Sequence, residues 1–74
     1  MTSKHPILAY RIKHDLSRQA LGDRIGVSRQ TVRRWEEEIR EIDLDLLPTV
    51  VSVTGIPARV LRPDLAKLFE EAGP

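Results

Sequence analysis

Residues 16–36 decide the fold of this chain, and they read LSRQALGDRIGVSRQTVRRWE. Ser17 is a good N-cap for a first helix, because its hydroxyl can accept a hydrogen bond from a free amide of the next turn. Gly26 provides the left-handed residue at which helices commonly end, and Ser28 can cap a second helix two residues later. The short link between them predicts two helices that cross steeply. The predicted helices cover residues 18–25 and 29–38.

Apolar residues recur at helical spacing in both predicted helices. Leu21 and Ile25 lie four residues apart in the first helix. The second helix places three apolar residues on one side, namely Val32, Trp35 and Ile39. This spacing is typical of amphipathic helices that bury one face. We therefore predict that Trp35 fills the core between the two helices and is not exposed for stacking.

This pattern resembles the helix-turn-helix of the Xre, Cro and lambda-repressor-like proteins. The matching positions are Gly22, Gly26, Val27, Val32, Trp35 and Glu36. Gly22 stands where that family places a tiny residue, because the two helices touch there. The resemblance implies an all-α, compact domain of four to five helices over residues 6–71, with the helix-turn-helix motif at residues 17–38. Residues 56–65 are similar to the tail of small YdaS-like phage and antitoxin proteins.

The residues before the motif predict one further helix. Pro6 suits the first turn of this helix, because that backbone position needs no amide proton. Leu8, Ile12 and Leu16 follow at intervals of four, so we expect them to form the buried stripe of a helix that ends near residue 14. Residues 1–5 are polar, and we expect them to be flexible.

The residues after the motif predict a connection and then a helix. We expect Ile39 and Ile42 to anchor the connection to the core. The helix begins near Asp45, which places Pro48 in its first turn, and it ends at Gly55. Its β-branched residues would suit a strand by propensity. A lone strand would have no partner, however, so we predict a helix.

The last part of the chain predicts a short helical turn over residues 57–61, which Pro63 ends, and then a final amphipathic segment. The apolar residues of this C-terminal third are Val60, Leu61, Leu65, Leu68 and Phe69. They can close the core of one chain or form the contact surface of a homodimer, and the sequence favours neither alternative. We expect residues 72–74 to fray.

Charge is divided between two halves of the chain, although the net charge is only +1. Residues 11–34 carry seven basic and two acidic residues, whereas residues 35–74 carry nine acidic and four basic residues. A basic region that coincides with a helix-turn-helix favours binding to nucleic-acid phosphates.

Other function classes find little support in the sequence. There is no cysteine for a disulfide or a thiolate, and no apolar run approaches the roughly 18 residues of a membrane span. His5 and His14 are too isolated to indicate a metal site, and we expect both on the surface. No nucleophile–base pair or phosphate-binding glycine loop indicates an enzyme. We therefore expect a cytoplasmic protein with no catalytic residue and no cofactor.

The resemblance implies roles for individual residues of the motif. In helix-turn-helix proteins the start of the second helix contacts base edges in the major groove. Arginine can donate two hydrogen bonds to guanine, glutamine can pair with adenine, and a threonine methyl can contact thymine. The expected base contacts are Arg29, Gln30, Thr31 and Arg34. The expected phosphate contacts are Ser17, Arg18, Ser28 and Arg33. The family also implies a structural ion pair between Arg11 and Glu36, and it usually has glutamine where this chain has Arg18.

The resemblance favours a sequence-specific regulator that binds double-stranded DNA, a bacterial or phage repressor of Cro type that occupies an inverted-repeat operator as a homodimer. One alternative is an antitoxin that binds its own promoter and uses its acidic half to bind a toxin protein. Another is a protein-interaction module on the same scaffold.

Overall fold

The structure, a computed structural model, describes residues 5–65, and no β-strand occurs among them. The chain forms two compact units, Met1–Glu41 and Ile42–Pro74. The all-α prediction is confirmed for the residues that the structure describes. The expectations for residues 1–4 and for residues 66–74, which include Leu68 and Phe69, lie outside that part.

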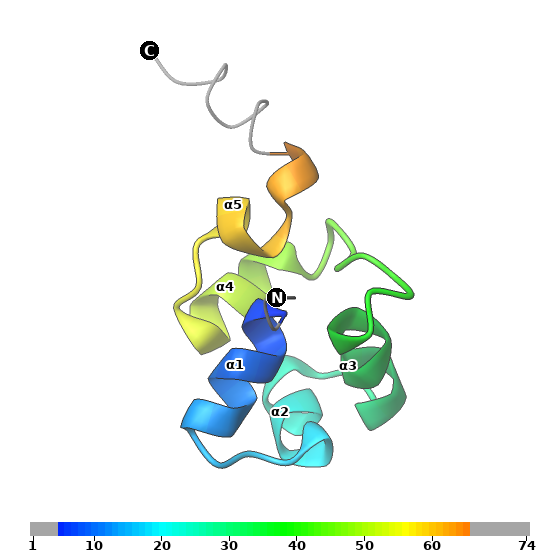
Figure 1. Ribbon diagram of the computed structural model, residues 1–74, viewed down its shortest axis with the longest axis vertical. Helices are drawn as coiled ribbons and strands as arrows, with labels where there is room; N and C mark the ends of the chain where they lie inside the picture. The colour runs from blue at the N-terminus through cyan, green and yellow to red at the C-terminus, as the bar shows by residue number, and fades with distance from the viewer. Residues whose placement is uncertain (1–4, 66–74) are drawn as a thin grey trace, which may run out of the picture. The chain divides into compact units, whose positions relative to one another are not determined.

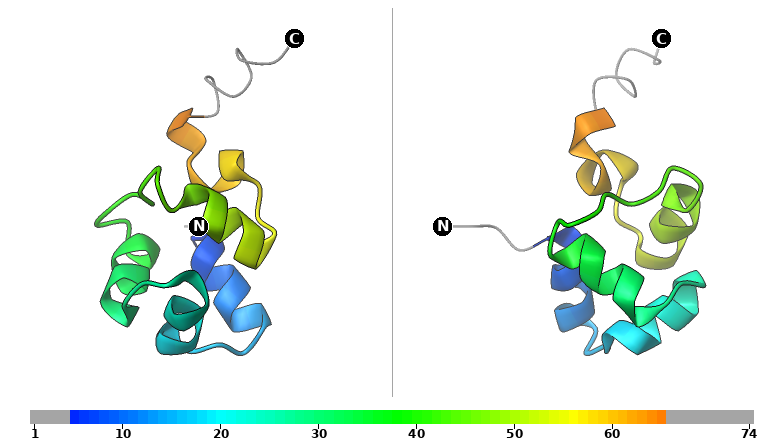
Figure 2. Two further views of the ribbon diagram at one scale, coloured as in Figure 1. Left: turned by 180° about the vertical axis from the view of Figure 1, so that it is seen from behind. Right: turned by 90° about the vertical axis from the view of Figure 1, so that its right-hand side faces the viewer.

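The first unit contains three helices, α1 (Pro6–Lys13), α2 (Arg18–Ile25) and α3 (Arg29–Glu36), which are coloured blue, cyan and green in Figure 1. Helix α3 packs against both α1 and α2. A short turn joins α2 to α3, and the two helices run in clearly different directions in the right-hand view of Figure 2. The arrangement is the predicted helix-turn-helix.

The caps of α2 and α3 confirm the local signals in the sequence. Ser17 Oγ accepts a hydrogen bond from Ala20 N at 3.0 Å, and Ser28 Oγ accepts one from Thr31 N at 3.2 Å. Gly26 ends α2 with a φ of 93°, in the left-handed region that glycine adopts without a steric penalty. These three residues fix where each helix of the motif begins and where the first one ends.

Gly22 allows α2 to approach the turn closely. A Cβ atom at this position would lie 2.6 Å from the carbonyl oxygen of Val27 and 3.4 Å from the backbone of Ser28. Both contacts are with backbone, which cannot move aside as a flexible side chain can. The expected close contact at Gly22 is therefore confirmed.

The core of the first unit contains both residues predicted for α2, two of the three predicted for α3, and a different residue of α1. Its fully or nearly fully buried apolar residues are Ile7, Leu21, Ile25, Val32 and Trp35. The prediction that Ile12 faces inward is wrong, because this side chain is 53 % exposed. The inward face of α1 instead passes through Ile7 and Arg11, which lie four residues apart on one side of the helix. Ile12 follows Arg11 and is rotated from it by about 100°, so its side chain points away from that face.

Helix α3 ends at Glu36, two residues earlier than predicted, because Glu38 adopts a left-handed conformation with a φ of 57°. The amide of Ile39 then donates to the carbonyl of Arg34 at 3.0 Å, which is the backbone pattern of a Schellman motif. The chain turns away at this point. Ile39 is 65 % exposed, so the expectation that it anchors the connection is wrong.

The left-handed Glu38 offers a way to stabilise the protein. A residue with a Cβ atom pays about 1–2 kcal/mol for this conformation, and glycine does not. We expect Glu38→Gly to raise the free energy of unfolding by about 1 kcal/mol in urea titrations followed by Trp35 fluorescence. Glu38→Ala retains the Cβ atom and serves as the matched control. Equal stability of the two variants would contradict this explanation.

His5 caps α1 and is half-buried, so it is less exposed than the surface position expected from the sequence. Its Nδ1 atom accepts a hydrogen bond from Ile7 N at 3.1 Å. Burial lowers the pKa of His5, and this effect outweighs the nearby carboxylates of Glu38, Glu36 and Glu41, which raise it. The folded protein therefore favours neutral His5.

A lowered histidine pKa makes stability depend on pH. The contribution of His5 is fully present above its ordinary pKa near 6.5 and is lost as the pH falls through the lowered pKa of the folded state. Asparagine caps helices at any pH. Between pH 7.5 and 5, we therefore expect the wild type to lose more unfolding free energy than His5→Asn. Parallel stability-against-pH curves would count against the role of the His5 cap.

The second unit contains α4 (Leu47–Thr54), α5 (Ala58–Leu61) and a 3-10 turn over Pro63–Leu65. Helix α4 packs against α5. The helix predicted in place of a strand is confirmed, and it ends at Gly55 in the left-handed region with a φ of 75°. It begins at Leu47 and not near Asp45, because residues 44–46 form a separate turn before it.

Apolar burial in the second unit falls on Ile42, Leu47, Val50 and Leu61. The expectation that Ile42 is anchored in a core is confirmed, since it is only 1 % exposed. Arg62 Nη1 donates to the carbonyl oxygen of Ile42 at 2.6 Å, and Arg62 also pairs with Asp64. The start of this unit is thereby joined to the turn that follows α5.

Candidate nucleic-acid interface

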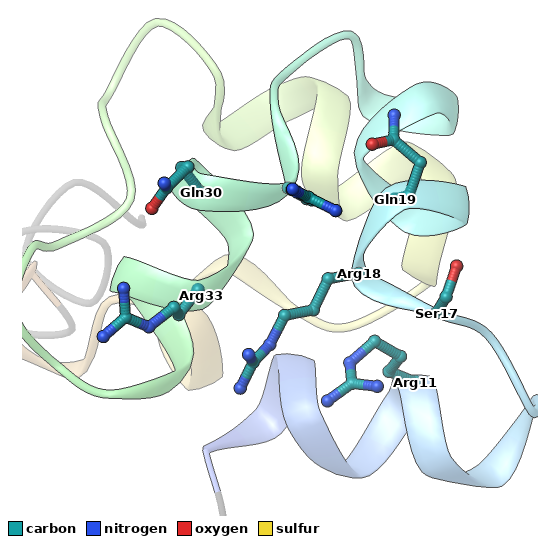
Figure 3. A pocket seen from close by; sticks show the side chains of 7 residues that line it. Arg11, Ser17, Arg18, Gln19, Gln30 and Arg33 are labelled. Carbon is teal, nitrogen blue, oxygen red and sulfur yellow. The ribbon is translucent and has the colours of Figure 1, made fainter.

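A basic groove lies within the first unit, between the end of α1, the start of α2 and the start of α3 (Figure 3). Its volume is about 630 Å³. Its lining residues are Arg11, Ser17, Arg18, Gln19, Arg29, Gln30 and Arg33. Four of these side chains are arginines and none is acidic. The groove therefore presents hydrogen-bond donors and positive charge to a ligand.

The exposed face of α3 borders this groove. Arg29 and Arg33 lie one turn apart on the helix, and so do Gln30 and Arg34. All four side chains are exposed. On the opposite side of the helix Val32 and Trp35 are fully buried. Burial of this rear face fixes the direction in which the polar residues of α3 point, and the prediction that Trp35 belongs to the core is confirmed.

The arginines of α3 differ in their intramolecular partners. Arg33 Nε pairs with Glu37 Oε2 at 2.7 Å, one turn further along, and both side chains are well exposed. Neither Arg29 nor Arg34 forms an ion pair with any residue between 5 and 65. These two guanidinium groups are available for an external ligand without the loss of an internal contact.

Glu36 joins two of the arginines that line the groove. Arg11 Nε donates to Glu36 Oε2 at 2.8 Å, and Arg11 Nη2 donates to Oε1 at 3.1 Å. Arg18 Nε donates to the same Oε1 atom at 3.0 Å. The Glu36 side chain is only 1 % exposed. The ion pair expected between Arg11 and Glu36 is present, and the second arginine on the same carboxylate was not predicted.

The two arginines keep Glu36 ionised although it is buried. Burial alone would raise the pKa of the Glu36 carboxyl, but the hydrogen bonds from Arg11 and Arg18 together hold the pKa below its ordinary value. The hydrogen bond to Glu36 in turn raises the pKa of Arg11. One negative and two positive charges leave this cluster with a net positive charge beside the groove.

The structure brings together most of the residues predicted to contact DNA. Five of the eight line the groove, and Ser28, Thr31 and Arg34 lie outside its lining. Thr31 is half-buried, and its hydroxyl lies 3.2 Å from Ser28 Oγ.

Two lining residues were missed. Arg11 was predicted only as a partner of Glu36, and Gln19 was not considered. The position of Gln19 in the first turn after the Ser17 cap is a signal that would have identified it.

A family model for helix-turn-helix proteins matches residues 7–61. The chain therefore belongs to the Xre and Cro type of helix-turn-helix proteins, and the predicted lambda-repressor-like fold is confirmed. Members of this family are DNA-binding regulators and generally not enzymes, so the chain is a DNA-binding transcription regulator whose partner is double-stranded DNA. No curated protein and no solved structure shows significant similarity to it.

Among residues 5–65, no helix is both long and apolar enough to cross a membrane. The same range contains no group of three acidic, histidine or cysteine side chains placed to hold a metal ion.

Proposed function

We propose that this regulator is a sequence-specific repressor of Cro type that inserts α3 into the major groove of operator DNA. The observation that carries the proposal is the exposed, unpaired start of α3, where Arg29 and Gln30 border an arginine-lined groove. An α-helix with its side chains is about 10–12 Å across, similar to the width of the major groove of about 12 Å, so α3 can enter it. A small protein bound at a promoter blocks RNA polymerase by occupying its site.

The proposed base contacts are those predicted from the sequence. Arg29 donates two hydrogen bonds to O6 and N7 of a guanine, and Gln30 pairs with N6 and N7 of an adenine. Arg34 follows Gln30 by one turn and reaches a base further along the major groove of the DNA. The methyl group of Thr31 contacts a thymine methyl.

The proposed phosphate contacts flank the base contacts and set their register. Arg18 and Arg33 line the groove and supply positive charge. Ser17 and Ser28 stand at the N-terminal ends of α2 and α3, where free backbone amides and the helix dipole attract an anion.

A homodimer on an inverted repeat completes the proposal, because one motif makes too few contacts for a specific site. A good bidentate contact provides about 1–3 kcal/mol of discrimination, whereas specific binding exceeds non-specific binding by about 4–10 kcal/mol. Among the described residues of the predicted contact surface, Leu61 is only 2 % exposed and is buried within the chain itself. Val60 is 44 % exposed and is accessible to a second chain. Sedimentation that shows one chain per operator would contradict the dimer.

Selection of bound sites from random duplex DNA at physiological salt tests the proposed function. We expect a consensus with two inverted half-sites, about 10 base pairs apart from centre to centre. A pool that shows no enriched sequence after repeated selection would overturn the proposal. A protein with this role acts on the chromosome, which places it in the cytoplasm of a bacterial cell.

A further inference from the structure

Arg11 and Arg18 bind the same carboxylate, that of Glu36, but they differ in how many of their nitrogens have a partner. All three nitrogens of the Arg11 guanidinium have partners, since Nη1 donates to the carbonyl oxygen of Leu16 at 3.2 Å while Nε and Nη2 bind Glu36. Its side chain is 19 % exposed. Arg11 is therefore anchored to the fold through all three nitrogens, and only two of its five N–H groups remain for a ligand.

Arg18 is held at one atom only. Its Nε donates to Glu36, and its two terminal nitrogens have no hydrogen-bond partner between residues 5 and 65. Its side chain is 39 % exposed, twice the value for Arg11. In the view of Figure 3 the Arg18 guanidinium lies between those of Arg11 and Arg33. Arg18 thus combines a fixed guanidinium orientation with two free donor groups at the lining of the groove.

Charge and side-chain entropy both favour Arg18 as a contact for an anion. A single carboxylate neutralises one of the two arginines, so the positive charge of the other is available to an anion. An unrestrained arginine loses up to about 2 kcal/mol of rotamer entropy when it is immobilised, and a guanidinium that is already oriented loses less of it on binding. Two parallel donors match the geometry of a phosphate.

We infer that Glu36 is a positioning residue for DNA binding, which holds Arg18 through Nε so that the two terminal nitrogens of Arg18 bind one backbone phosphate in the groove. The inference rests on the proposed function, because it specifies how one of the proposed phosphate contacts is made. It assigns Glu36 a role beyond its structural pair with Arg11. It also has an unusual consequence, since removal of a negative charge from a DNA-binding surface weakens binding.

A double-mutant cycle on duplex affinity tests the inference. The four proteins are the wild type, Arg18→Ala, Glu36→Gln and the double variant, measured by fluorescence anisotropy with a random-sequence duplex. We expect Glu36→Gln to weaken binding about five-fold in the presence of Arg18 and by less than about 1.5-fold in the Arg18→Ala background. Arg18→Ala should also reduce the slope of log affinity against log salt by about 0.9 per protein chain bound. Glu38→Gln removes an exposed acid outside the cluster and serves as the control; we expect it to leave affinity unchanged or slightly higher.

Three results would overturn the inference. Equal losses from Glu36→Gln in both backgrounds would show that Glu36 acts only through the fold and Arg11. Tighter binding of Glu36→Gln would show that it acts only as a negative charge. If Glu36→Gln does not fold, as reported by Trp35 fluorescence, Arg18→Lys replaces it in the test. Lysine keeps the charge but lacks the forked donors, so wild-type affinity and salt slope for Arg18→Lys would also contradict the inference. Absence of any duplex binding by the wild type would instead contradict the proposed function.

Discussion

Replacing Arg29 and Gln30 together by alanine is expected to weaken binding to the selected operator by at least about 100-fold, because each chain of the proposed dimer loses two base contacts worth about 1–3 kcal/mol each. Affinity for random duplex DNA should fall by only a few-fold, since one positive charge is removed from a surface that retains several. The ratio of the two affinities is therefore the quantity to measure, by fluorescence anisotropy at a single salt concentration.

The matched control for this double variant is Arg24→Ala. Arg24 is an exposed arginine of α2 that does not line the groove. We expect its replacement to change specific and random duplex affinity by the same small factor. If the Arg29→Ala, Gln30→Ala variant retained the wild-type preference for the operator, α3 would not be the element that contacts the bases. Trp35 fluorescence verifies that each variant is folded.

The second large effect is expected at Gly22. Alanine is favoured over glycine within a helix by about 1 kcal/mol, so propensity alone predicts that Gly22→Ala stabilises α2. The new Cβ atom, however, would lie 2.6 Å from the backbone oxygen of Val27. We expect a net loss of about 2–4 kcal/mol in unfolding free energy, because α2 and the turn must separate to admit the methyl group.

Urea unfolding followed by Trp35 fluorescence measures this loss. A domain of this size has a total stability of about 4–11 kcal/mol, so the effect is a large share of it. Arg24→Ala in the same helix is the control and should change stability by less than about 0.5 kcal/mol. A Gly22→Ala protein as stable as the wild type would show that the close approach of α2 to the turn does not contribute to the fold.

The motif was predictable because its signals are local. Ser17 and Ser28 each cap a helix through a hydrogen bond to a residue three positions later, and Gly26 adopts the conformation that glycine favours. Such contacts depend only on neighbouring residues, so the sequence contains the information needed to place them. The bounds of α2 and the start of α3 follow from these residues.

The errors arose where distant residues decide the outcome. Ile12 satisfies the helical spacing of α1, yet the face of that helix that lies inward carries Ile7 and Arg11, and the partner of Arg11 is Glu36, 25 residues further along the chain. Glu38 is not a residue that marks a left-handed conformation, so the early end of α3 and the exposure of Ile39 had no local signal.

In the candidate site, too, local features were predictable from the sequence and contacts between distant residues were not. The exposed residues of α3 could be identified from their spacing, because Val32 and Trp35 define which face is buried. The contact of Arg18 with Glu36 joins residues 18 positions apart, so neither residue alone predicts it. Arg18 is therefore predictable from the sequence as a phosphate contact, whereas the carboxylate that orients it is not.

Substitution of single guanines by 7-deazaguanine in the selected operator tests most directly whether α3 contacts base edges in the major groove. This change removes only the N7 acceptor. At one guanine per half-site, we expect a loss of affinity of about 5- to 10-fold for the wild type and almost none for Arg29→Ala, since the hydrogen bond from Arg29 is already absent in the variant. Wild-type binding that tolerates 7-deazaguanine at every position, but weakens when inosine removes the minor-groove amino group, would contradict the account.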